Sequence, residues 1–285
     1  MTLPYPIIAS TVEDLRRTVG AWRADGCTVG LVPTMGALHA GHLSLVETAR
    51  KRVQKVVVSI FVNPAQFAPT EDFDSYPRTF NDDVMKLQPH GVEAVFAPNA
   101  CNMYQPGFAT RVSVEGPALG LETDYRPHFF SGVATVVTKL LLSCLPDAAF
   151  FGEKDYQQLR VIGQLVSDLN IPTEIVPVPT VREADGLALS SRNVYLSPGE
   201  RAIAPRLHGE LRAAAHAIRA GGAPEMALKA ARHSITEAGF RINYLELRNA
   251  ETLAPLDAAT KPGTPKRLLV AAWLGKTRLI DNIAV

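Results

Sequence analysis

Two histidines that stand three residues apart, His39 and His42, lie in the stretch TMGALHAGH at residues 34–42. An apolar run precedes the stretch and a helical pattern follows it, so we expect a strand end followed by a helix that begins near Gly41. Free backbone N–H groups and the helix dipole favour phosphate at such a position. Imidazoles there can hydrogen-bond phosphate oxygens as charge develops on them, which suits stabilisation of a pyrophosphate leaving group.

The same stretch has features of other kinds of site. Gly36 and Gly41 have the spacing of a Walker phosphate loop. However, His42 stands where that loop has Lys, and Leu43 stands where it has Ser or Thr. Two histidines at i and i+3 could bind zinc with a third ligand from elsewhere, although HExxH is absent. They could also be structural histidines at a strand-to-helix turn. GxGxxG and GxSxG are absent, and the GKT at residues 275–277 lacks the first glycine of a Walker loop.

Two later clusters place cations and hydroxyls after other apolar runs. Lys154 lies in FFGEKDYQQL, and Ser190, Ser191 and Arg192 lie in ADGLALSSRN. Taken alone, Lys154 is equally compatible with an ordinary surface lysine, and the second cluster with a helix cap or a turn. The three clusters together provide the cations and hydroxyls that a nucleoside triphosphate needs.

Amide side chains accompany these clusters. Asn63 and Gln66 lie in FVNPAQF, and Gln157 and Gln158 lie in YQQL. A buried glutamine amide both donates and accepts hydrogen bonds, so a pair of them suits a small hydroxy acid. The alternative is that these amides satisfy loop backbone groups.

Strand and helix signals alternate over the first two thirds of the chain, and they predict βαβ units in an open parallel sheet. Strands are predicted at 28–34, 55–62, 92–98, 147–152 and 173–179, and helices at 10–26, from about 41 to 52, at 133–143 and at 155–170. After about residue 180 an Ala-rich helical stretch at 197–222 is followed by a helix after Pro224 and by strands at 242–248, 267–275 and 278–285. We therefore predict an α/β fold: a Rossmann-like parallel sheet with helices on both faces at residues 1–180, and a smaller α+β domain at 181–285 that carries the SSRN loop.

The composition of the chain limits the classes of function that it can have. The chain has 285 residues, 29 Lys plus Arg against 28 Asp plus Glu and a net charge of +1, which gives no support to nucleic-acid or membrane binding. The N-terminus does not resemble a signal peptide, and no apolar run approaches the roughly 18 residues of a membrane helix. The three cysteines lie far apart without a CxxC, as expected of thiols in a reducing compartment. We expect a cytoplasmic protein.

Four motifs in this order, PTMGALHAGH, FVNPAQF, FGEKDYQQL and DGLALSSRN, resemble the pantothenate synthetase (pantoate–β-alanine ligase) family. The resemblance runs from about residue 5 to the C-terminal TRLIDNIAV. The HxGH element alone would indicate only the wider nucleotidylyltransferase superfamily. The resemblance implies an ATP-dependent ligase that forms pantoyl adenylate and pyrophosphate from ATP and (R)-pantoate with Mg²⁺. β-Alanine then attacks the adenylate and AMP leaves. The resemblance also suggests a homodimer.

The resemblance also implies roles for single residues. The residues that the resemblance implies to be catalytic are His42, His39, Lys154, Ser190 and Arg192. His42 would be the acid. Asp155 would lie near the ribose and Val181 near adenine, while Gln66, Gln158 and, more weakly, Asn63 would bind pantoate or β-alanine. The full implied ATP site comprises Met35, Gly36, Ala37, Leu38, His39, Ala40, Gly41, His42, Gly152, Glu153, Lys154, Asp155, Val181, Leu189, Ser190, Ser191 and Arg192.

The chain departs from the family pattern at RPHFFSGV, where the family usually reads RPxHFxGV. Phe129 occupies the position where the family has histidine, and His128 precedes it. The substrate contact of the family's histidine is therefore kept here only if His128 faces the site. Ala65 stands where methionine is common. Asp82 and Asp83 are potential magnesium neighbours or helix caps, and the magnesium ligands remain open.

Three other functions remain compatible with these residues. One is another adenylyl or cytidylyl transferase of the HxGH superfamily, against which the paired glutamines argue. A second is a non-catalytic nucleotide-binding module, and a third is a zinc hydrolase. A substrate screen, calorimetry with ATP and metal analysis after dialysis distinguish them.

Overall fold

A computed structural model describes residues 4–69, 71–257, 260–261 and 263–285. The chain forms two compact units, which we call unit 1 and unit 2 and describe separately. Unit 1 is Met1–Glu115, Arg126–Glu153 and Val161–Pro179, and unit 2 is Gly116–Tyr125, Lys154–Arg160 and Thr180–Val285. Two short segments, 116–125 and 154–160, therefore belong with the C-terminal part of the chain.

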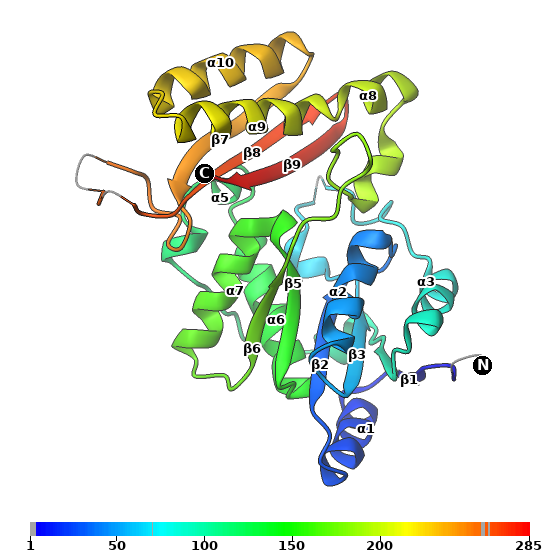
Figure 1. Ribbon diagram of the computed structural model, residues 1–285. Coiled ribbons are helices and arrows are strands. Elements are labelled where there is room, and N and C mark those ends of the chain that lie inside the picture. Colours follow the sequence, from blue (N-terminus) through cyan, green and yellow to red (C-terminus); the bar gives the residue numbers. More distant parts are fainter. Residues whose placement is uncertain (1–3, 70, 258–259, 262) are drawn as a thin grey trace. The chain divides into compact units, whose positions relative to one another are not determined.

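Unit 1 is built on a six-stranded parallel sheet (Figure 1). The strand order is β1-β4-β3-β2-β5-β6, so β3 and β4 extend to one side of β2 while β5 and β6 extend to the other. In such sheets ligands bind beside the carboxyl ends of the strands where the order reverses, here between β2 and β5. The strands are β1 (Ile7–Ala9), β2 (Val29–Thr34), β3 (Lys55–Ile60), β4 (Ala94–Phe96), β5 (Ala148–Gly152) and β6 (Glu174–Val178).

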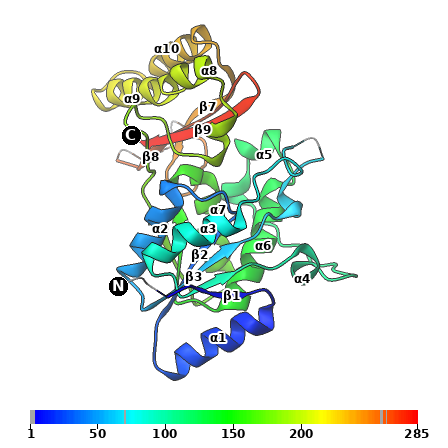
Figure 2. The same ribbon diagram turned by 90° about the vertical axis from the view of Figure 1, so that its right-hand side faces the viewer.

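Helices cover both faces of this sheet, which explains why its strands are apolar without alternation. Helix α2 (Ala40–Arg50) packs on one face, where its Leu45, Val46 and Ala49 join a buried cluster with the valines of β3. Helices α1 (Val12–Ala24) and α6 (Phe129–Cys144) lie on the other (Figure 2). Further helices are α3 (Phe80–Leu87), α4 (Ala100–Met103) and α7 (Tyr156–Asp168), of which α7 begins in unit 2.

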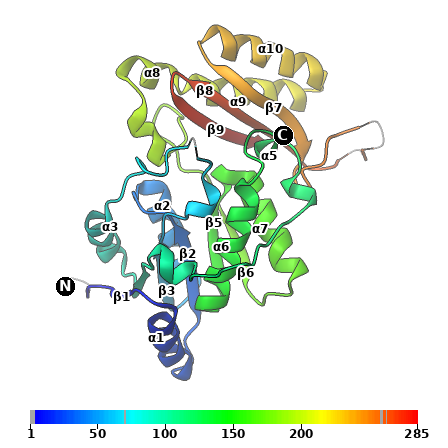
Figure 3. The ribbon, with the colours of Figure 1, turned by 180° about the vertical axis from the view of Figure 1, so that it is seen from behind.

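Unit 2 contains a three-stranded antiparallel sheet in the order β7-β8-β9, with two long helices along one face (Figure 3). These helices bury alanine and leucine faces against Leu245, Leu268 and Val270 of the sheet. The elements are α5 (Glu122–Tyr125), α8 (Pro198–Ile203), α9 (Arg206–Arg219), α10 (Pro224–Glu237), β7 (Arg241–Asn249), β8 (Lys266–Leu274) and β9 (Thr277–Ala284). The predicted fold class, a parallel sheet plus a smaller α+β part, is confirmed.

One predicted helix is wrong in detail. The stretch 197–222 forms two helices, α8 and α9, because Pro205 has no amide hydrogen and its ring clashes with the preceding turn. Ser197 caps α8 as predicted, with its side chain accepting a hydrogen bond from the Glu200 N–H. Strand β1 and helix α3 were not predicted. Within the described part of the chain, no helix has the length and apolar character that a membrane span requires.

Candidate active site

The two histidines begin helix α2. His39 is the N-cap, and its Nδ1 accepts a hydrogen bond from the Gly41 N–H at 3.1 Å. His42 occupies the third helical position, and its Nδ1 accepts from the His39 N–H at 3.3 Å. The two rings lie 4.1 Å apart, centroid to centroid. This is a capping box in which imidazoles replace the usual Ser and Glu, and it explains the spacing of three.

These hydrogen bonds determine which nitrogen of each ring carries the proton. An Nδ1 atom that accepts from a backbone N–H cannot itself be protonated, so a neutral ring has its proton on Nε2. Each histidine is therefore an Nε2–H donor at the N-terminus of α2. The structural reading and the phosphate-binding reading of the histidine pair are compatible, because they use different atoms of the same rings.

A buried carboxylate shapes the loop before α2. Asp83 of α3 is fully buried, and it accepts hydrogen bonds from the Ala37 N–H at 2.9 Å and the Leu38 N–H at 2.7 Å. Gly36 and Ala37 both have positive φ, which is uncommon for alanine. A Cβ at Gly36 would lie 3.1 Å from the Asp83 carboxylate. One turn later Lys86 donates to the Leu38 carbonyl at 2.8 Å. Asp83 thus fixes an otherwise unfavourable backbone conformation.

The turn after β3 carries the predicted amides. Gln66 Nε2 lies 2.8 Å from Met35 Sδ, which brings two predicted site residues together. Asn63 is buried and uses both ends of its amide within unit 1. Its Nδ2 donates to Gln66 Oε1 at 3.1 Å and to the Gly132 carbonyl at 3.2 Å, and its Oδ1 accepts from the Tyr104 hydroxyl at 2.7 Å. Asn63 therefore orients Gln66.

Tyr104 is a stable donor to Asn63. Burial raises the pKa of the Tyr104 hydroxyl to about 12, although the hydrogen bond to Asn63 acts in the opposite direction. The hydroxyl therefore keeps its proton at neutral pH. Tyr104 also lines a cavity of about 500 Å³, together with Ala65 and His128.

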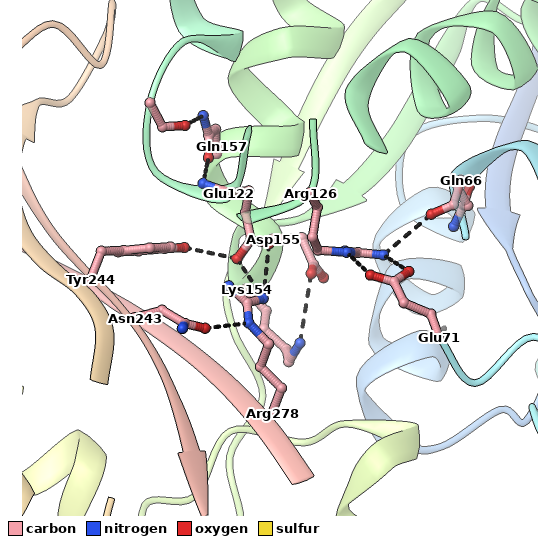
Figure 4. Close-up of polar contacts among 11 residues, drawn as sticks. Gln66, Glu71, Glu122, Arg126, Lys154, Asp155, Gln157, Asn243, Tyr244 and Arg278 are labelled. Atoms are coloured by element: carbon pink, nitrogen blue, oxygen red, sulfur yellow. Dashed lines mark hydrogen bonds and ion pairs between the residues drawn. The ribbon is translucent and has the colours of Figure 1, made fainter. Parts of the chain in front are cut away.

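An ion pair supports the chain that follows Gln66. Arg126 donates to the Glu71 carboxylate through Nε at 2.5 Å and a terminal nitrogen at 2.7 Å, and that terminal nitrogen also lies 3.2 Å from the Gln66 carbonyl (Figure 4). Both side chains are largely buried. Bidentate arginine–carboxylate pairs of this kind give geometric precision as well as attraction.

In unit 2, the candidate loop is a small hairpin followed by a 3₁₀ turn. Leu189 N–H donates to the Val181 carbonyl at 3.0 Å, and Gly186 at its tip has a φ of 96°. Ser190 caps the 3₁₀ turn Ser191–Tyr195, because its Oγ accepts from the Arg192 N–H at 3.3 Å. The cap anticipated for these serines is therefore present, and the Ser190 hydroxyl hydrogen remains a donor.

The two adjacent glutamines have different environments. Gln157 is buried and donates to the Pro117 and Gly120 carbonyls while it accepts from the Glu122 N–H at 3.0 Å. Gln157 therefore holds the segment 116–125 in unit 2. Gln158 is half-buried, and its side chain has no hydrogen bond to another described residue, so its side-chain amide is available to a ligand. The alternative that a glutamine satisfies loop backbone applies to Gln157.

A second buried network secures the same segment. Arg278 of β9 contacts both carboxylate oxygens of Glu122, at 2.9 and 2.8 Å, and Tyr244 donates to Glu122 at 2.9 Å (Figure 4). Burial and the neighbouring Glu122 carboxylate raise the pKa of Tyr244 well above its ordinary value, so Tyr244 stays protonated. Lys154 lies beside Asp155, with Nζ 3.7 Å from the carboxylate, and its side chain is 20% exposed.

The predicted site residues thus form two groups, each within one unit. Unit 1 holds the histidine loop and the Asn63–Gln66 turn at the ends of neighbouring strands β2 and β3. Unit 2 holds Lys154 and the SSRN loop. The members in unit 1 are Met35, Gly36, Ala37, Leu38, His39, Ala40, Gly41, His42, Asn63, Gln66, Gly152 and Glu153, and those in unit 2 are Lys154, Asp155, Gln158, Val181, Leu189, Ser190, Ser191 and Arg192.

Comparison with known proteins assigns the family. A family model described as pantoate-beta-alanine ligase matches residues 7–284. The chain belongs to the pantoate–β-alanine ligase family. Family membership makes it an enzyme that joins pantoate and β-alanine, and it accounts for the order of the four motifs.

Similar proteins match the pantoate–β-alanine ligase chain over nearly its whole length. The pantothenate synthetase of Bradyrhizobium sp. strain BTAi1 is 58% identical over 281 residues, which is 98% of this chain and 99% of that protein. A crystal structure of pantothenate synthetase from Thermus thermophilus is 49% identical, with a TM-score of 0.90 over 97% of this chain and 98% of that one. A pantoate–β-alanine ligase from Francisella tularensis, complexed with β-γ ATP and β-alanine, is 35% identical with a TM-score of 0.83, covering 98% and 97%.

The departure from the ligase family pattern at residues 128–129 has a structural outcome. Phe129 stacks on Arg126, whose guanidinium carbon lies 3.8 Å from the ring centroid. His128 lines the cavity beside Tyr104, together with Ser131, Gly132 and Thr135 of the same face of α6. Successive helical residues point about 100° apart, so His128 does not share the direction of Phe129.

The sequence interpretation assigned no site role to four residues that contact the candidate segments of unit 1: Asp83, Lys86, Tyr104 and Arg126. Only Asp83 was considered, as a magnesium neighbour or helix cap. One sequence signal could have pointed to Asp83: it and Lys86 stand three residues apart on a helix that was not predicted. The Asp83 carboxylate can accept from backbone N–H groups, and the Lys86 ammonium can donate to a backbone carbonyl.

The contact between α6 and the Asn63–Gln66 turn predicts a large effect of one methyl group. A Cβ at Gly132 would lie 2.1 Å from the Ala65 carbonyl oxygen, so Gly132→Ala must displace backbone. We expect the free energy of unfolding to fall by about 1–3 kcal/mol or more, measured by urea denaturation. Gly163→Ala in α7 is the matched control, because apart from its own helix backbone no atom lies within 4 Å of an added Cβ. Gly163→Ala should raise the free energy of unfolding by about 0.5–1 kcal/mol. Equal effects of the two substitutions would contradict the packing argument.

Proposed function

We propose that this enzyme is an ATP-dependent, AMP-forming ligase that joins (R)-pantoate to β-alanine through a pantoyl-adenylate intermediate. The observation that supports this most directly is the imidazole capping box at the end of β2, beside the reversal of strand order. That position combines a positive helix terminus with two Nε2–H donors, which suits an anionic leaving group. The complex of the Francisella tularensis ligase, named for a form of ATP and β-alanine, supports both substrates.

In the proposed first step, a carboxylate oxygen of pantoate attacks the α-phosphorus of ATP. The bond from that phosphorus to the bridging oxygen breaks, and pyrophosphate leaves with the added negative charge. His39, His42, Lys154, Ser190 and Arg192 stabilise this charge, and His42 does so by donating a hydrogen bond from its Nε2–H. Holding the two reactants together supplies a large part of the rate, since orientation can contribute about 7–11 kcal/mol.

In the proposed second step, the β-alanine amine attacks the acyl carbon of pantoyl adenylate. The amine loses a proton, and AMP leaves with the electrons of the acyl–oxygen bond. Gln66 and Gln158 hold the pantoate hydroxyls in both steps, and Asn63 keeps Gln66 in the required direction. Asp155 and Val181 bind the ribose and the adenine.

Magnesium enters the proposal only as the ion that ATP carries on its phosphates. Both carboxylate oxygens of Asp83 accept hydrogen bonds from the loop before α2, so Asp83 is a poor metal ligand. Across the described residues, no three His, Cys, Asp or Glu side chains are grouped as a metal site. Magnesium commonly keeps its waters and binds nucleotide phosphates with few protein ligands.

The deciding experiment measures exchange of labelled pyrophosphate into ATP, with Mg²⁺ and with or without pantoate. We expect exchange only when pantoate is present, because the adenylate forms only then. Folded protein without pantoate-dependent exchange would exclude the proposal. Exchange that depends on a different acid in a substrate panel would favour another adenylyl transferase of the superfamily. We also propose a homodimer, on the strength of the family resemblance, and a cytoplasmic location, because three widely spaced cysteines without a CxxC are typical of a reducing compartment.

A further inference from the structure

The C-terminal strand contains two adjacent polar residues that are both buried. Asp281 and Asn282 of β9 are each 4% exposed. Adjacent residues of a strand point to opposite faces of its sheet, so these two side chains reach different parts of unit 2. Neither has a role in the proposed chemistry, although both belong to the C-terminal stretch that carried the family resemblance.

Asp281 holds the hairpin that precedes the SSRN loop. Its carboxylate forms a bidentate pair with Arg182, at 2.7 and 2.8 Å, and lies 3.2 Å from His208 of α9. Arg182 also donates to the Gly186 carbonyl at 3.1 Å, and a Cβ at Gly186 would lie 3.2 Å from the His208 ring. Burial alone would raise the pKa of Asp281, but His208 and Arg182 lower it overall, so the carboxylate is charged at neutral pH.

Asn282 holds the segment that carries Lys154. Its Nδ2 donates to the Lys154 carbonyl at 2.9 Å, and its Oδ1 accepts from Arg267 Nε at 2.7 Å. The Arg267 guanidinium in turn lies over the ring of Tyr156, 4.1 Å from the centroid. The main chain at Lys154 is thus connected to β9 by a part-buried hydrogen bond from a buried side chain.

We propose that Asp281 and Asn282 are positioning residues for the adenylation step: together they fix Lys154 and the Ser190–Arg192 loop relative to one another. This inference rests on the proposed function, because it assigns both groups to the phosphates of one ATP. One strand holds both segments through opposite faces, so their separation is set by the fold of unit 2 alone. A displacement of about 1 Å in such a site can reduce the rate about 10²-fold.

The test compares Asp281→Asn and Asn282→Ala with a matched control, Asp185→Asn. Asp185 lies in the same hairpin and pairs with Arg201 at 2.6 Å, but both side chains are well exposed. Two half-reactions are measured: pantoate-dependent pyrophosphate exchange, and the reaction of β-alanine with supplied pantoyl adenylate. Positioning predicts that exchange falls about 10²-fold in both test variants while the second half-reaction stays within about twofold. Asp185→Asn should leave both within about twofold.

The outcomes separate the inference from the proposed function. Wild-type protein without pantoate-dependent exchange would refute the proposed function. Active wild type with normal exchange in Asp281→Asn would overturn the positioning role. If Asp281→Asn does not fold, Asn282→Ala decides, and its normal exchange would likewise overturn it. Equal loss of both half-reactions in a folded variant would indicate a merely structural role and also count against the inference.

A second readout needs no substrate. Hydrogen–deuterium exchange of the amides in 181–193 should be faster in Asp281→Asn than in Asp185→Asn, because the Arg182 anchor is lost. Unchanged protection of these amides in Asp281→Asn would contradict the positioning inference even if activity were lost.

Discussion

Replacing Lys154 by alanine is expected to slow formation of the adenylate by about 10²–10³-fold, equivalent to about 3–4 kcal/mol of transition-state stabilisation. In the proposed mechanism the Lys154 ammonium faces pyrophosphate as negative charge develops on it. Its nearest carboxylate, that of Asp155, lies 3.7 Å away and is 46% exposed, so the pair contributes little to stability. The unfolding transition should therefore move little, and single-turnover adenylation in rapid quench is the measurement.

Lys276→Ala is the control for Lys154→Ala. Lys276 is an exposed lysine of the β8–β9 turn in the same unit, within the GKT that resembles part of a Walker loop. Its replacement removes the same charge from unit 2 and should leave adenylation within about twofold, since surface charges contribute little. Normal adenylation in Lys154→Ala, or equal loss in both variants, would remove Lys154 from the mechanism.

Replacing His42 should have a comparable effect, and two variants separate its two functions. His42→Ala loses both the Nδ1 acceptor for the His39 N–H and the Nε2–H donor. It should lose adenylation about 10²–10³-fold and about 1 kcal/mol of stability. His42→Gln keeps an acceptor at the third position of the capping box, where Glu and Gln are favoured. It should keep most of the stability and still lose the activity.

Single-turnover adenylation and urea denaturation of both His42 variants provide the measurement. An active His42→Gln would show that the ring serves only as a helix cap. A stable His42→Ala would instead contradict the capping box. Each result has a different meaning because the two functions depend on different nitrogens of one ring.

The fold was largely predictable because its signals are local. Continuous β-branched runs such as that of β3 require cover on both faces, and each helix between them is long enough to show its period. Strand β1 has only three residues, two of them exposed, so it leaves no pattern that sequence reasoning can detect. Helix α3 has Val84 and Leu87 at helical spacing, but it is only eight residues long and has no side-chain cap to mark its start. The break at Pro205 was visible but was outweighed by the alanine-rich run around it.

The site was predictable only in part. Residues near strand ends, such as His39 and Lys154, could be proposed from the sequence because position along the chain implies position in a sheet. The residues that orient them were missed, because the contacts of Asp83 and Asp281 span 45 and 99 positions of sequence. Gln157 and Gln158 show the same limit. They are neighbours in sequence, and only the structure shows that one is occupied by backbone carbonyls while the other is not.

The dependence of the histidine loop on Asp83 has a consequence for how the enzyme acquires its site during folding. The N–H groups of Leu38 and of Ala37, which is left-handed, gain their hydrogen-bond acceptor from α3, a helix that is synthesised later. Non-local contacts of this kind form late, since chain closure must precede them. A nascent chain that ends before Thr79 would contain the complete His-x-Gly-His motif but not its shape, so nucleotide affinity should appear with tertiary docking and not with synthesis of the motif.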